Sequence, residues 1–141
     1  MKKRLMALGA ASAMLLVFMA GPAHADLADN TWGPFARSTT GASVSNCWLY
    51  SWKGNVHDQY GRVECNLKDT MADGDAVYVE WVQDGYAAIS LYNHGGNGTT
   101  KFVADTRYNG DGSFGTLKFR VCRDQGFPSS DNCSDWVIRH P

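Results

Sequence analysis

Residues 76–93 read AVYVEWVQDGYAAISLYN, and this stretch decides the fold class. Apolar side chains alternate with others over residues 77–81 and again over residues 87–91, which is the two-residue period of a strand with one buried face. The sequence QDG at residues 83–85, between the two runs, is typical of a tight turn. Residues 76–93 are therefore predicted to form an antiparallel β-hairpin.

Short runs of the same kind recur on both sides of this hairpin, and no stretch keeps an apolar period of 3.6 residues. Gly, Asn and Asp separate the runs, as in the turn-like sequence NGDG at residues 109–112. About seven short strands spaced in this way predict an all-β fold, a small antiparallel β-sandwich or barrel. Besides the hairpin, the predicted strands cover residues 44–52, 62–68, 102–108, 116–121 and 136–139.

The apolar phase of each strand predicts the hydrophobic core. Residues at every second position of a strand point to the same side of the sheet, so the apolar set is expected to face inward. The side chains expected to be buried are Val77, Val79, Trp81, Ile89, Leu91, Leu117, Phe119 and Val121.

Residues 1–25 have the three parts of a secretory signal peptide. Basic residues occupy positions 2–4, an apolar run covers residues 5–20, and Ala-His-Ala at residues 23–25 places small residues before a cut at Asp26. The apolar run of 16 residues is shorter than the ~20 residues that a membrane-spanning helix needs. The sequence therefore predicts a cleaved leader and a secreted, extracellular protein.

The expected mature chain divides into a lead-in and one domain. Residues 26–40 are predicted to be a loose N-terminal lead-in, with Trp32 and Phe35 docking onto the body. Residues 41–141 contain no repeat or linker and are predicted to form a single β-domain, a monomer.

Charge excludes two classes of partner. Removal of the leader takes away three of the 13 basic residues and no acidic one, which leaves 10 basic and 14 acidic residues. A net charge near −4 is unlike that of a protein that binds nucleic acid or an anionic lipid surface. We therefore expect no nucleic-acid partner and, after signal cleavage, no membrane contact.

All four cysteines, Cys47, Cys65, Cys122 and Cys133, follow the leader, and an even number in an exported small domain predicts two disulfides. Their spacing lacks the close cysteine pairs of a zinc site. Three pairings are compatible with the sequence. We expect Cys47–Cys65 and Cys122–Cys133, because each pair flanks a short segment with turn character.

The two ends of the mature chain carry a resemblance. The sequence NTWGP at residues 30–34, VCRD at residues 121–124 and CSDW at residues 133–136 resemble small secreted proteins of Streptomyces and related actinomycetes, most of which have no recorded function. The likeness covers these ends and the strand rhythm between them. It implies an exported, disulfide-bonded β-domain and brings no catalytic residue with it.

Catalytic motifs are weak. The chain has no G-x-S-x-G sequence to hold a nucleophilic serine, so a small secreted hydrolase using His57 or His94 with nearby acids is the alternative hypothesis. The two glutamates, Glu64 and Glu80, fall on predicted strands and are interpreted as parts of solvated faces. No catalytic residue is therefore assigned.

Metal-binding patterns are weak as well. Residues 105–116 have part of the spacing of a calcium-binding loop, but Arg107 stands at its third position and Thr116 at its twelfth, where a Glu is required. A hairpin turn explains these residues better. Residues 73–75, Asp-Gly-Asp, are a second weak candidate for Ca²⁺. We expect neither a metal nor a cofactor.

The most suggestive feature is the row Trp48, Tyr50 and Trp52, whose spacing of two places all three side chains on one face of a strand. A row of aromatic rings can hold the apolar faces of pyranose sugars. The same residue types also dominate β-sandwich cores, and general frequencies favour the core. The two interpretations differ in one observation: if Cys47 and Leu49 point inward, the row lies outside.

Three further tyrosines, Tyr78, Tyr86 and Tyr92, fall on the polar phases of their strands and are expected to extend an exposed aromatic surface. Tyrosine is also enriched at protein-binding surfaces. The leading hypothesis is therefore a secreted, non-catalytic binding protein whose partner is an extracellular protein or polysaccharide.

Overall fold

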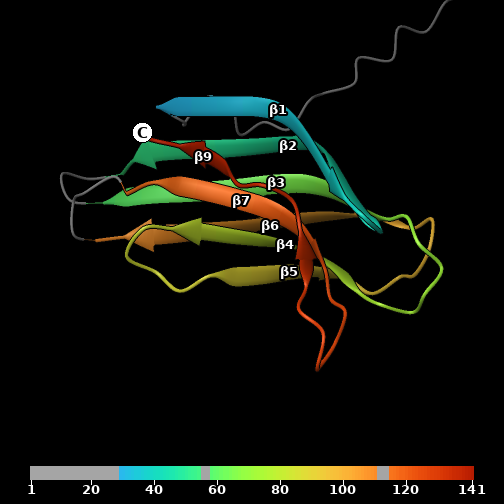
Figure 1. The fold of residues 1–141 in the computed structure, drawn as a ribbon. Helices are drawn as coiled ribbons and strands as arrows, with labels where there is room; N and C mark the ends of the chain where they lie inside the picture. The colour runs from blue at the N-terminus through green and yellow to red at the C-terminus, as the bar shows by residue number, and fades with distance from the viewer. Residues whose placement is uncertain (1–28, 55–57, 111–114) are drawn as a thin grey trace, which may run out of the picture.

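The computed structural model describes residues 29–54, 58–110 and 115–141. Within these ranges the chain is all-β, with nine strands and no helix, and its strands form two antiparallel sheets (Figure 1). Accordingly, this part of the chain has no helix long and apolar enough to cross a membrane. The strands are β1 (Asn30–Thr39), β2 (Ala42–Lys53), β3 (Gln59–Asp69), β4 (Val77–Gln83), β5 (Ile89–Asn93), β6 (Thr100–Asn109), β7 (Leu117–Arg123), β8 (Asn132–Cys133) and β9 (Val137–Arg139).

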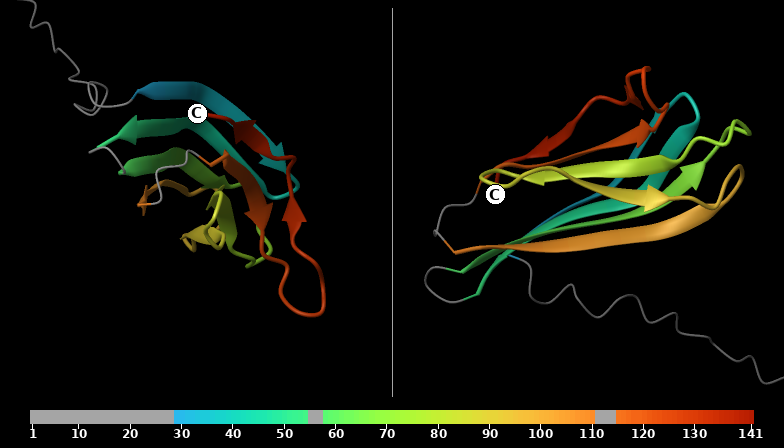
Figure 2. Two further views of the ribbon diagram at one scale, coloured as in Figure 1. Left: turned by 90° about the vertical axis from the view of Figure 1, so that its left-hand side faces the viewer. Right: turned by 90° about the horizontal axis from the view of Figure 1, so that it is seen from below.

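The two sheets lie face to face as the layers of a sandwich (Figure 2). Sheet A has the strand order β1-β2-β3-β6. Sheet B has the order β5-β4-β7-β8, and β9 also pairs with β7. The predicted hairpin is present, with β4 and β5 paired from Val77 opposite Asn93 to Trp81 opposite Ile89. The all-β prediction is confirmed, and the sandwich is the form it takes.

The core lies between the sheets and contains most of the predicted side chains. Those of β4 and β7 are fully buried: Val77, Val79, Trp81, Leu117, Phe119 and Val121. Ile89 and Leu91 are only partly buried, although they pack against the core. The difference arises because β5 is an edge strand of sheet B, with a neighbour on one side only.

The prediction of a loose lead-in over residues 26–40 is wrong for residues 30–39. These residues form β1, which pairs along β2, and their Trp32 and Phe35 pack against the core as expected. Gly33, Pro34 and two register shifts interrupt the alternation that would reveal a strand. With β1 and the two-residue β8, the described residues contain nine strands, whereas about seven were predicted.

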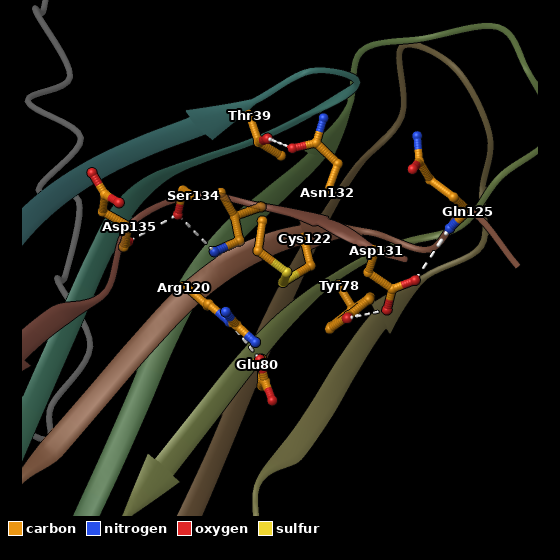
Figure 3. Close-up of a disulfide and its surroundings, with 12 residues drawn as sticks. Thr39, Tyr78, Glu80, Arg120, Cys122, Gln125, Asp131, Asn132, Ser134 and Asp135 are labelled. Atoms are coloured by element: carbon orange, nitrogen blue, oxygen red, sulfur yellow. Dashed lines mark hydrogen bonds and ion pairs between the residues drawn. A yellow bond between two sulfur atoms is a disulfide. The ribbon is translucent and has the colours of Figure 1, made fainter. Parts of the chain in front are cut away.

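Both expected disulfides are present. Cys47–Cys65 joins β2 to β3, and Cys122–Cys133 joins β7 to β8, so each bond links neighbouring strands of one sheet. Figure 3 shows the second disulfide beside the hydrogen bond from Thr39 to Asn132, which ties the end of β1 to β8. Two disulfides in a domain of this size are compatible with an extracellular protein.

Candidate functional site

The row Trp48, Tyr50 and Trp52 lies on the outer face of sheet A. Cys47 and Leu49, which alternate with the row along β2, are both 0% exposed and belong to the core. The three aromatic side chains therefore point away from the second sheet, and each is partly exposed. The core position that general frequencies favour for strand aromatic residues is therefore wrong for this row.

Two tyrosines on neighbouring strands extend the row across the sheet. Tyr60 on β3 lies directly opposite Trp52, and Tyr108 on β6 lies opposite Tyr60. The ring centroids are 5.2 Å apart for Trp52 and Tyr60 and 5.3 Å apart for Tyr60 and Tyr108. We call Trp48, Tyr50, Trp52, Tyr60 and Tyr108 the aromatic face. Sequence analysis missed its last two members because their position depends on the pairing of β2, β3 and β6.

The ring planes of the aromatic face are partly aligned. Trp52 and Tyr60 are within 6° of parallel, and Trp48 and Tyr50 are within 24° at a centroid distance of 6.5 Å. Tyr108 is tilted by 46° to Tyr60 and is 50% exposed. The face is thus open to solvent at the β6 edge and packed on itself elsewhere.

A polar network lies among the rings. The Arg62 Nε donates to Glu64 Oε1 at 2.7 Å, and its Nη1 donates to Thr106 Oγ1 at 2.7 Å. The Tyr50 hydroxyl donates to the other carboxylate oxygen, Glu64 Oε2, at 3.2 Å. One cation therefore compensates one anion on the face, and three hydrogen bonds among four side chains hold the network in place.

Two phenols of the aromatic face, those of Tyr50 and Tyr108, remain protonated at neutral pH. Burial, with a further contribution from the Glu64 carboxylate, raises the pKa of Tyr50 to about 12. The Tyr108 hydroxyl donates to Asp58 Oδ1 at 2.7 Å, and this hydrogen bond raises the pKa of Tyr108. Both groups are therefore uncharged hydroxyls under physiological conditions.

Two of the three further tyrosines do not extend this face. Tyr78 and Tyr92 pair across β4 and β5 on the outer side of sheet B, and Tyr86 lies in the turn between those strands. Tyr78 is only 6% exposed, and its hydroxyl donates to Asp131 Oδ2 at 2.5 Å, in the β7–β8 connection (Figure 3). The expectation is wrong for Tyr78 and Tyr92, which lie on the opposite side of the sandwich from the aromatic face. Tyr86 is 39% exposed and lies beside β6, with its ring centroid 5.8 Å from the Arg107 guanidinium carbon.

The histidines and glutamates of the hydrolase alternative are dispersed. His57 lies outside the described residues, and the His94 ring stacks on Tyr92 at 5.0 Å, with no carboxylate hydrogen-bonded to it in the described ranges. Glu64 is paired with Arg62 on sheet A. Glu80 accepts from Arg120 Nε at 2.6 Å on sheet B (Figure 3). The two glutamates therefore face opposite sides of the molecule.

The weak metal candidates have other partners. Arg123 Nη2 lies 2.7 Å from Asp73 Oδ2 and 2.8 Å from Asp75 Oδ2, so a guanidinium occupies the position between these two carboxylates. Asp105 accepts a hydrogen bond from the indole Nε1 of Trp81 at 2.7 Å, whereas residues 111–114 lie outside the described ranges. These aspartates therefore serve the ion pairs and hydrogen bonds of the fold.

Comparisons with known proteins give no match: no family model, curated protein or solved structure is significantly similar to this chain.

Proposed function

We propose that this protein is a secreted, non-catalytic binding protein whose aromatic face binds an extracellular glycan. The observation that carries the proposal is the position of the Trp48, Tyr50 and Trp52 row on the outside of sheet A, continued by Tyr60 and Tyr108. The leader-like residues 1–25 and the two disulfides support export.

The composition of the face favours a glycan over an extracellular protein. Pyranose rings have apolar C–H faces and hydroxyl edges, so they match a surface that mixes aromatic rings with hydrogen-bonding side chains. The aromatic face has both, because Arg62 and Thr106 lie beside its rings. A protein partner would also use tyrosine and tryptophan, and the experiment below separates the two classes.

The test is retention of the exported protein on insoluble cellulose, chitin and xylan. We expect the wild-type protein to be retained by at least one of them. Trp52→Ala should weaken retention at least roughly tenfold, because an aromatic anchor at a binding surface typically contributes ~2 kcal/mol or more. Its melting temperature should change little, since Trp52 is partly exposed and outside the core.

The matched control is Phe127→Ala. Phe127 is fully exposed in the β7–β8 connection, away from sheet A, and its removal should leave retention unchanged. The wild-type protein could instead bind no glycan and bind an identified extracellular protein in a Trp52-dependent way. That result would show that the partner is a protein and not a glycan.

A further inference from the structure

The aromatic face contains two rows that meet at Trp52. One follows β2 and consists of Trp48, Tyr50 and Trp52. The other, which we call the cross-strand row, consists of Trp52, Tyr60 and Tyr108 at paired positions of β2, β3 and β6. Ring contacts are continuous along the cross-strand row. In the part of the chain that the structure describes, no ring contact joins Tyr50 to Trp52, so the β2 row is interrupted.

A polar row runs parallel to the cross-strand row. It consists of Tyr50, Arg62 and Thr106, which are also paired across β2, β3 and β6. Each lies two positions along its strand from a member of the cross-strand row, so the two rows are roughly 7 Å apart. The Arg62 side chain is 29% exposed, Thr106 is exposed, and the guanidinium has N–H groups beyond the two that donate to Glu64 and Thr106. Hydrogen-bonding groups therefore lie along one edge of the cross-strand row.

The charges amid the rings compensate each other. Arg62 and Glu64 form an ion pair with an N–O distance of 2.7 Å, and the Tyr50 and Tyr108 phenols are uncharged. Beside Tyr108 the Asp58 carboxylate adds one negative charge, so a ligand over these rings meets no uncompensated cation among these residues. This favours an uncharged polymer over a uronate-containing or sulfated one, which would require unpaired cations.

We infer that the ligand is an uncharged, linear polysaccharide whose chain lies across β2, β3 and β6, with sugar faces on the cross-strand row and hydroxyls bonded to Arg62 and Thr106. This inference rests on the proposed function and specifies the class of ligand. It also specifies the path of the sugar chain over the aromatic face, which we call the track. The chain direction follows from the continuity of the ring contacts and from the solvent-open edge at Tyr108, 50% exposed on β6. Trp48, two positions beyond Tyr50 on β2, lies off this track.

Binding isotherms on the insoluble polysaccharide that retains the wild-type protein test the track. Tyr108→Ala should weaken binding at least roughly tenfold, and Thr106→Val, which removes only the hydroxyl, by roughly threefold to tenfold. Trp48→Ala should weaken binding less than Tyr108→Ala does, and Phe127→Ala, outside the aromatic face, should stay within about twofold of the wild-type affinity. Melting curves establish that each variant is folded.

Ionic strength tests the ligand class in the same assay. Affinity should change less than about twofold up to about 1 M NaCl, where exposed charges are screened within ~3 Å. Polygalacturonate should not compete. Strong dependence on Trp48 with none on Tyr108, or loss of binding in salt, would overturn this inference while leaving glycan binding standing. Absence of binding to every polysaccharide would instead refute the proposed function and, with it, the track.

Discussion

Phe119→Ala is expected to lower the free energy of unfolding by about 3–5 kcal/mol. The Phe119 side chain is 0% exposed and pairs with Trp81 on one side and Val137 on the other, and its ring lies 6.0 Å from that of Phe35 on β1. Its removal leaves a cavity that both sheets line. Because domains of this kind have only ~5–15 kcal/mol of total stability, the variant should accumulate poorly.

Chemical denaturation of the wild-type and variant proteins measures the effect, with Phe127→Ala as the matched control. Phe127 loses the same atoms from a fully exposed site, so its variant should lie within about 0.5 kcal/mol of the wild type. Equal stability of the two variants would show that the core is not where the structure places it.

Removal of the Cys122–Cys133 disulfide by a paired replacement with serine should cost about 3 kcal/mol. The bond closes a short loop, and in the chain-entropy model its loss frees the unfolded chain more than the folded one. The melting temperature should fall by several degrees at least, as on reduction of the native protein. Thermal melts with and without a reductant measure both effects.

Peptide mapping of the exported, unreduced protein gives the independent check. It should recover Cys47 linked to Cys65 and Cys122 linked to Cys133. Free thiols in the exported protein would contradict the assignment of an oxidising compartment.

The alternation of apolar and polar residues predicted the central strands and which of their side chains are buried. The alternation over residues 77–81 and 117–121 identified both the strands and their buried phase. β1 escaped prediction because Gly33 and Pro34 break its alternation, and its pairing with β2 is what makes it a strand. Ile89 and Leu91 also depend on strand pairing, since their partial exposure follows from the edge position of β5.

The candidate site depends even more on contacts between strands that are distant in the sequence. Alternation placed Trp48, Tyr50 and Trp52 on one face, but only the packing of the sheets decided that this face is outside. Tyr60 and Tyr108 join the face through strand register, which the sequence does not reveal. Tyr78 and Tyr92 have the same local pattern and lie on the opposite side of the sandwich, because β4 and β5 belong to the other sheet.

Chemical-shift mapping locates the surface at which a soluble glycan binds, which we propose is the outer face of sheet A. ¹⁵N-labelled protein would be titrated with cellulose- and chitin-derived hexasaccharides. We expect shifts at the Trp52 indole N–H and along β2, β3 and β6, with β4, β5 and β7 unaffected. Shifts confined to sheet B, or a saturating ligand that leaves the Trp52 indole unchanged, would contradict it.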